Sequence, residues 1–318
     1  MPDMARANLE DRIEQVRELG RKPVTDQTMA SLRKAFGDRS NLVVAQAAKV
    51  VGELQLRDLI PDLLRVFDRM LQKGSATDPK CWAKKAIVDA LTKMDHDQSD
   101  VFVRGLRHIQ MEPVWGGQED SALSLRGSCA LALLQCGDLS RHAKFRYLVD
   151  AMADPAEPVR VDAVRAIAQM EGDDGALLLR LKARVGDSNF RVTGQVLESI
   201  INVEGEQGVA FVRGFLESEH DEVCEEAALA LGASRLAAGF AALKEAWTRE
   251  RNKPRGEVFL RAISAAGLPE AIDFLVTLIR EGLQREADAA VRALELYSGS
   301  EEIEAKVHDA LKQRKNRE

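Results

Sequence analysis

Residues 159–167, VRVDAVRAI, contain the pattern that decides the fold. Val159, Ala163 and Ala166 lie at spacings of four and three residues, so they share one face of a helix. Comparable Ala- and Leu-rich segments bring the number of copies to eight, spaced 29 to 42 residues apart. This period predicts a repeat protein built from helix pairs. The residues that correspond to Val159-Arg160 are Val43-Val44, Ala83-Lys84, Leu125-Arg126, Phe190-Arg191, Val223-Cys224, Val258-Phe259 and Ala287-Asp288.

An aspartate stands five positions before the apolar residue in four of the repeats. These residues are Asp38, Asp78, Asp120 and Asp154. An Asp side chain accepts hydrogen bonds from the unpaired N–H groups at a helix start, and its charge suits the positive end of the helix. Pro79 and Pro155 follow two of them, as expected in a first helical turn. Each Asp therefore predicts the N-cap of the second helix of its pair.

The turn Asp, the Val-Arg pair and the Ala-rich second helix together resemble the HEAT-repeat family, and most closely its short repeats of the phycobilisome-lyase type. The resemblance covers about residues 26–297. It implies an all-α, right-handed, armadillo-like α-solenoid of about eight helix pairs. We expect an N-terminal capping helix within residues 1–25, the solenoid over 26–297, and a C-terminal capping helix with a basic tail over 298–318, because terminal caps cover the apolar ends of such a stack.

The same alignment places the individual helices. Capping helices are expected at 9–19 and 301–312. The first helices of the pairs are expected near 26–37, 57–73, 98–110, 139–152, 173–185, 206–217, 235–249 and 269–281. The second helices are expected to begin near Asn41, Pro79, Asp120, Ala156, Ser188, Asp221, Gly256 and Arg285.

Composition agrees with a helical repeat protein. Aromatic residues are 5% of the chain, so the helices are expected to pack through small side chains rather than around one large core. None of the four cysteines belongs to a CxxC pair, which predicts buried thiols in a reducing compartment. The charged N-terminal segment and the lack of a long apolar run predict neither a signal peptide nor a membrane span, and hence a cytoplasmic protein.

Two insertions lengthen the second and third repeats, and insertions in repeat arrays are frequent sites of function. The first insertion leads into Trp82 and Lys85. The second spans residues 108–120, and a proline and two glycines within it predict a loop rather than a helix. Its candidate partner-binding residues are His108, Trp115, Gly116 and Gly117.

Trp115 has two alternative roles. A tryptophan in an inserted loop more commonly folds back to fill the gap that the insertion opens, but tryptophan is also frequent among interface hot spots. The glycines that follow it either supply a turn, which is the commoner role, or let a ligand approach the backbone. The sequence leaves these alternatives open.

A row of cations occupies the second position of four successive repeats: Lys84, Arg126, Arg160 and Arg191. On the concave face of a solenoid, they would form a track for phosphates or for an acidic partner segment. The HEAT resemblance instead implies a structural ladder between these cations and the turn aspartates, which we favour because an unpaired buried arginine is costly. Val44, Cys224, Phe259 and Asp288 replace the cation elsewhere, so the ladder is expected to fail at both ends.

The net charge of −6 disfavours nucleic acid as the main partner. Residues 1–150 carry 23 Lys and Arg against 21 Asp and Glu, whereas residues 151–318 carry 22 against 30. A local basic patch around Trp82 and Trp115 leaves a nucleic-acid alternative. HEAT-like DNA glycosylases are similar in fold class and use aromatic residues with an Asp, for which Trp115 and Asp120 would be the candidates. A bilin-lyase-like protein is a third alternative, raised by the resemblance alone.

Catalytic and cofactor signatures are thin. The chain contains no GxGxxG, Walker or HExxH motif, and no nucleophile stands at a suitable spacing from His108. Residues 95–100 could hold a divalent cation, although a solvated turn is the commoner role of such a run. We therefore predict no metal, no cofactor and a non-catalytic scaffold that binds a protein on its concave face and on the 108–120 loop. Its expected contact residues are Trp82, Lys84, Lys85, His108, Trp115, Gly116, Gly117, Arg126, Arg160 and Arg191.

Overall fold

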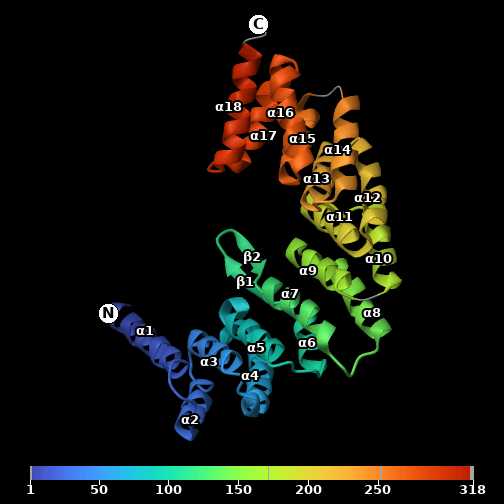
Figure 1. Ribbon diagram of the computed structural model, residues 1–318. Helices are drawn as coiled ribbons and strands as arrows, with labels where there is room; N and C mark the ends of the chain where they lie inside the picture. Colours follow the sequence, from blue (N-terminus) through green and yellow to red (C-terminus); the bar gives the residue numbers. More distant parts are fainter. Residues whose placement is uncertain (1, 171, 251–252, 316–318) are drawn as a thin grey trace. The chain divides into compact units, whose positions relative to one another are not determined.

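The computed structural model describes residues 2–170, 172–250 and 253–315 and shows an all-α solenoid that carries one small β-hairpin (Figure 1). Contacts divide the chain into two compact units, residues 1–169 and 170–318, which are called the N-terminal and C-terminal units below. Within the described residues, each unit contains four helix pairs, and a further helix stands at each end of the chain. The predicted fold class, with eight pairs and two terminal helices, is confirmed.

The N-terminal unit begins with helix α1, which packs on α2 and α3. Its four pairs are α2–α3, α4–α5, α6–α7 and α8–α9, and the hairpin β1–β2 is inserted within the third pair. The bounds are α1 Pro2–Leu19, α2 Asp26–Ala35, α3 Asn41–Glu53, α4 Ile60–Lys73, α5 Trp82–Lys93, α6 Asp100–Leu106, β1 Met111–Val114, β2 Gly117–Asp120, α7 Leu123–Ala132, α8 Arg141–Met152 and α9 Glu157–Ala168.

The C-terminal unit repeats the same order of first and second helices and ends with α18, which packs on α16. Its bounds are α10 Asp173–Val185, α11 Phe190–Glu204, α12 Glu206–Val212, α13 Asp221–Ala233, α14 Ala237–Arg249, α15 Lys253–Ala265, α16 Pro269–Glu281, α17 Gln284–Leu294 and α18 Glu301–Lys315.

Small residues let successive second helices pack closely within each unit. In the N-terminal unit α3 contacts α5, α5 contacts α7 and α7 contacts α9; in the C-terminal unit α11, α13, α15 and α17 follow the same order. A Cβ atom at Gly52 of α3 would lie 2.8 Å from the Cα atom of Ala90 in α5, so a larger residue would push these helices apart. First helices supply larger core residues such as Leu63 and Phe67, both fully buried.

Three of the four turn aspartates lie two residues before the N-cap rather than at it. Asp38, Asp120 and Asp154 each accept a hydrogen bond from the N–H of the residue two positions later, at 2.8 to 3.0 Å, and the N-cap is that later residue. They therefore close the turn before the second helix, as Asx turns do, rather than cap the helix itself. Asp78 differs, because its carboxylate accepts from the N–H groups of Ala83 and Lys84, both at 2.9 Å. Pro155 also lies in the turn, outside α9.

The predicted alignment of the fifth repeat is wrong by two residues. Asp187 accepts from the N–H of Asn189 at 2.9 Å, which is the turn that Asp154 makes in the fourth repeat. Val192 and Thr193, both buried, therefore correspond to Val159 and Arg160. Phe190 and Arg191 are exposed instead. The sequence contained this signal, since Asp187 stands five residues before Val192.

The four cysteines are buried free thiols, as predicted. Burial raises the pKa of the Cys81 thiol to about 11, which keeps it protonated. Among the residues that the structure describes, no helix is both long and apolar enough to cross a membrane.

Candidate functional site

Arg126 links two adjacent repeats of the N-terminal unit and is only 2% exposed. Its Nη1 donates to Asp120 Oδ2 at 2.6 Å, while its Nε and Nη2 donate to the two carboxylate oxygens of Asp154 at 2.8 and 3.0 Å. Desolvation alone would lower the pKa of Arg126, but the hydrogen bonds with both carboxylates raise it. The predicted inter-repeat ladder is confirmed at this residue.

Lys84 is fully buried and forms the preceding step of the ladder. Its Nζ lies 3.4 Å from Asp78 Oδ2 and donates to Gln110 Oε1 at 2.8 Å. The other oxygen of Asp78 accepts from Asn41 Nδ2 at 2.8 Å. A neutral residue of α3 thus contacts Asp78 from the first repeat, where Val44 takes the place of the cation.

The N-terminal end of the ladder does not fail as predicted. Arg12 Nη1, on capping helix α1, lies 2.8 Å from both oxygens of Asp38. No repeat spacing signals this contact, because α1 lies outside the repeat pattern.

The predicted basic track requires a correction. Lys84, Arg126 and Arg160 are buried, and Arg160 Nη1 donates to the carbonyl oxygens of Asp154 and Pro155 at 2.9 and 3.1 Å. Arg191 is exposed but lies outside the alignment of the other three. Because the three buried cations are committed to the fold, we assign them to its polar framework and not to a partner surface.

The predicted 108–120 loop is an antiparallel hairpin that stands out from the helices around it (Figure 1). Val114 pairs with Gly117, so Trp115 and Gly116 form a two-residue turn. Gly116 has φ +90°, which a residue with a side chain rarely adopts, and this confirms its predicted turn role. Trp115 is 102% exposed, so of its two alternative roles the one in which it packs back against the repeat is excluded. Because the hairpin begins early, α6 ends at Leu106 rather than near residue 110.

Glu112 anchors the base of the hairpin. Its Oε1 accepts from the N–H of Lys80 at 2.6 Å, from Gln110 Nε2 at 2.6 Å and from Ser121 Oγ at 2.5 Å. Desolvation would raise the pKa of Glu112, but these hydrogen bonds hold it below its usual value. They also stabilise an unusual backbone, since Lys80 and Cys81 both have positive φ, at +59° and +55°. The sequence did not identify Glu112, because nothing in its spacing marks it.

His108 precedes the hairpin and is half-buried, with Nε2 3.3 Å from Gln110 Oε1. Desolvation is the main reason that its pKa is lowered, and the charges of Lys84 and Arg126 act in the same direction. His108 is therefore a neutral member of the buried polar network rather than part of an exposed contact surface.

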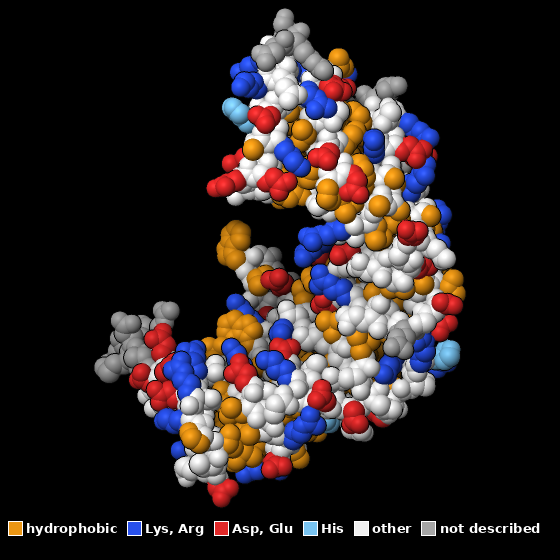
Figure 2. Space-filling view, viewed as in Figure 1, with side chains coloured by type: hydrophobic (Ala, Val, Ile, Leu, Met, Phe, Trp, Pro, Cys, Tyr) orange, Lys and Arg blue, Asp and Glu red, His pale blue; other side chains and the backbone are white. Residues whose placement is uncertain are grey.

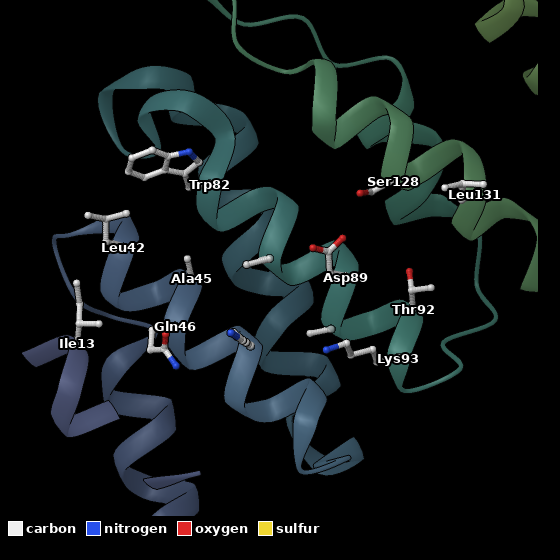
Figure 3. A pocket seen from close by; sticks show the side chains of 13 residues that line it. Ile13, Leu42, Ala45, Gln46, Trp82, Asp89, Thr92, Lys93, Ser128 and Leu131 are labelled. Carbon is white, nitrogen blue, oxygen red and sulfur yellow. The ribbon is translucent and has the colours of Figure 1, made fainter. Parts of the chain in front are cut away.

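Four helices of the N-terminal unit enclose an open apolar groove of about 690 Å³ (Figure 3). Trp82 stands at the start of α5, 47% exposed, and Leu42 faces it from α3. Lys80 Nζ lies 5.6 Å from the centre of the Trp82 ring. The groove is lined by Ile13 of α1; Leu42, Ala45, Gln46 and Lys49 of α3; Trp82, Ala86, Asp89, Ala90, Thr92 and Lys93 of α5; and Ser128 and Leu131 of α7.

Lysines surround this apolar surface. Lys49 and Lys93 line the groove and are exposed, and Lys49 Nζ lies 3.9 Å from Glu53 Oε1. The carboxylate of Asp89, which also lines the groove, lies 2.6 Å from Lys85 Nζ. In Figure 2, basic and acidic side chains are interspersed with exposed apolar ones over the N-terminal unit. The groove therefore offers an apolar floor with a net positive rim. Of the predicted contact residues, Trp82 and Lys85 belong to this surface.

The remaining polar candidates do not form a metal site. No group of His, Cys, Asp and Glu within residues 2–170, 172–250 and 253–315 has the arrangement that would hold a metal ion. In the 95–100 run, Ser99 instead donates its N–H and hydroxyl to Asp138 of the next turn. This run is therefore part of the turn structure.

Comparison with known proteins gives weak similarities only. No family model matches the chain, and no curated protein matches it. Human deoxyhypusine hydroxylase in complex with glycerol is 16% identical, with 92% of this chain and 99% of that chain covered and a TM-score of 0.33. An engineered protein is 14% identical, with 96% and 94% covered and a TM-score of 0.36. The complex of CpcE and CpcF of phycocyanin lyase from a Nostoc species is 14% identical, with 92% and 96% covered and a TM-score of 0.35. At such low identities and TM-scores, none of the three proteins indicates an activity, a ligand or a partner for this chain.

Proposed function

We propose that this protein is a non-catalytic scaffold that binds a segment of a partner protein in the groove between α1, α3, α5 and α7. The observation that carries the proposal is the open groove of about 690 Å³ with an apolar floor and a half-exposed tryptophan at one end. Concave apolar sites with a few polar groups are typical binding sites, and tryptophan is frequent among the residues that dominate interface energies. The exposed hairpin tip, Val114 to Gly117, supplies a second contact.

The charge of the rim defines the partner segment. Lys93 is exposed at the groove and Lys80 lies over the Trp82 ring, whereas Lys49 lies 3.9 Å from Glu53 and Asp89 is paired with Lys85. A segment with apolar anchors flanked by Asp or Glu would match both the floor and the rim. We therefore propose an acidic amphipathic segment, and we place the encounter in the cytoplasm because all four cysteines are free thiols.

The nucleic-acid alternative is less well supported. The cations that would neutralise a phosphate backbone, Lys84, Arg126 and Arg160, are buried in the ladder. Asp120, the carboxylate that a glycosylase-like site would use, accepts from Arg126 and from the N–H of Ala122. The bilin-lyase alternative rests on the sequence resemblance alone.

Selection from a displayed library of random peptides tests the proposal directly. The library carries peptides of about 16 residues, enough for about four helical turns, and the immobilised bait is the full chain. We expect enriched sequences in which apolar residues repeat at spacings of three or four and acidic residues flank them. Trp82→Ala should weaken their binding by at least about tenfold, the loss expected for a hot-spot residue.

Phe190→Ala is the matched control, because Phe190 is an exposed aromatic residue of the C-terminal unit and does not line the groove. It should bind the selected peptides as the unmodified chain does. Enrichment of basic peptides, or peptides that bind equally well after Trp82→Ala, would contradict the proposal. A single-stranded or duplex oligonucleotide that binds with steep salt dependence, and only when Trp82 is present, would favour the nucleic-acid alternative instead.

A further inference from the structure

The hairpin presents an unusual amount of exposed apolar surface. Ile109, Met111, Val114 and Trp115 are 61%, 49%, 45% and 102% exposed, and they fall within seven consecutive residues. Clustered exposed apolar side chains of this size mark interaction sites, because a free surface of this kind promotes non-specific association. The hairpin is therefore a candidate contact surface for a concave apolar site.

The charge of the hairpin complements that of the groove. Residues 111–120 contain Glu112, Glu119 and Asp120 and no Lys or Arg. Glu119 is exposed on β2, whereas Glu112 and Asp120 are hydrogen-bonded at the hairpin base. The groove has an apolar floor and exposed lysines. One chain therefore carries both an acidic, apolar hairpin and a basic, apolar groove.

We propose that the groove of one copy of this chain binds the hairpin of a second copy, and that the exchange is reciprocal and forms a two-fold dimer. In such a dimer each copy contributes both surfaces, so the contact closes and no open fibre results. The hairpin has ten residues and the groove is lined by 13, which together match the about 20 to 30 residues that each partner contributes to a stable interface. The dimer goes beyond the proposed function, because it requires no other protein.

The hairpin is suited to act as a rigid arm. Ser121 N–H donates to the Gln110 carbonyl at 2.9 Å, Gln110 N–H donates to Asp120 at 3.1 Å, and Glu112 accepts three hydrogen bonds at the base. An arm that is already ordered loses little conformational entropy on binding. While the arm occupies the groove, a partner segment cannot enter it, so the dimer is a closed resting form and an acidic partner segment competes with it.

Sedimentation velocity of the full chain, without any partner, tests the dimer at protein concentrations between about 1 μM and about 100 μM. A reversible dimer with a dissociation constant in this range is partly dissociated at these concentrations. We expect a monomer–dimer equilibrium. Trp115→Ala removes the largest apolar side chain of the hairpin, and Ala86→Arg places a long side chain in the groove. Each should weaken dimerisation by at least about tenfold. Leu296→Ala, which removes an exposed apolar side chain of the C-terminal unit, should leave it unchanged.

A mixture of the two dissociated variants gives a sharper result. Trp115→Ala keeps an intact groove and Ala86→Arg keeps an intact hairpin, so the mixture should restore one of the two contacts and form a heterodimer that neither variant forms with itself. Circular dichroism establishes that each variant is folded, and Trp82→Ala replaces Ala86→Arg if the latter is not. A wild-type chain that stays monomeric at about 100 μM, or a dimer that survives both variants, overturns the proposal. Neither result contradicts the peptide selection, because a monomeric chain leaves the groove open to peptides and a dimer only weakens their binding by competition.

Discussion

At the scale of single residues, Arg126 shows how a charge is held inside this fold. The guanidinium is almost fully buried, and it contacts the carboxylates of both Asp120 and Asp154. Arg126→Met keeps most of the side-chain volume but leaves two carboxylates without their cation. We expect a loss of about 3 to 5 kcal/mol in the free energy of unfolding, measured by urea denaturation, because breaking a buried ion pair from one side leaves an uncompensated charge.

Arg146→Ala is the matched control, since Arg146 is an exposed arginine on α8. It should change stability by less than about 0.5 kcal/mol. Equal effects of the two substitutions would mean that Arg126 contributes nothing through its burial.

The sequence predicted the ladder because its Asp-to-Arg spacing repeats. It did not predict Arg12 or Asn41, because they approach the turn aspartates from helix positions that carry no repeating signal.

The acid stability of the N-terminal unit provides a second test at this scale. Desolvation would raise the pKa of Asp120, but hydrogen bonds from the N–H of Ala122 and from Arg126 lower it below its ordinary value. A carboxyl with a lowered folded-state pKa adds stability above its unfolded value, about 3.9, and that stability is lost as the pH falls through the folded value. Asp120→Asn removes this contribution, so it should lose less stability than the unmodified chain between about pH 5 and pH 2. Parallel losses by urea denaturation in this range would show that the Asp120 carboxylate is not preferentially stabilised in the fold.

At the scale of secondary-structure elements, the hairpin depends on one backbone conformation. Gly116 has φ +90°, whereas Gly117 lies in β2 without a positive φ, and a Cβ atom at either position would meet nothing within 4 Å. Gly116→Ala therefore tests backbone strain without steric overlap and should cost about 1 to 2 kcal/mol locally. We expect faster amide hydrogen exchange in both strands of the hairpin. Gly117→Ala should leave their exchange nearly unchanged, and similar acceleration by both would show that φ at Gly116 is not the cause.

The elements differ in how well the sequence predicted them. The helix pairs were predictable because burial against two neighbours imposes a regular apolar spacing on every repeat. The hairpin was not, since four-residue strands with mostly exposed side chains carry little alternation, and Pro113 argued for a loop. The fifth repeat shows a different limit: Phe190 and Arg191 imitate the apolar-cation pair, but the turn at Asp187 places Val192 in the core. The groove could not be predicted, because its lining comes from four helices and its residues follow no repeating pattern.

At the scale of the whole molecule, stability is expected to be local. In a repeat protein each pair contacts only its neighbours, so the total stability is close to a sum of repeat and neighbour contributions. Contacts in this chain gather into two units, residues 1–169 and 170–318, each with its own buried core. A change in one unit should therefore leave most of the other unit unaffected.

Two substitutions, one in each unit, test this expectation. A Cβ atom at Gly232 of α13 would lie 2.3 Å from the carbonyl oxygen of Ala262 in α15, so Gly232→Ala must push apart two helices of the C-terminal unit. We expect this overpacking to cost about 1 to 3 kcal/mol and to accelerate amide exchange mainly within residues 170–318. Arg126→Met should accelerate exchange mainly within residues 1–169. If either substitution accelerated exchange evenly along the chain, the two units would unfold as one cooperative body, and the solenoid would transmit a local perturbation over its full length.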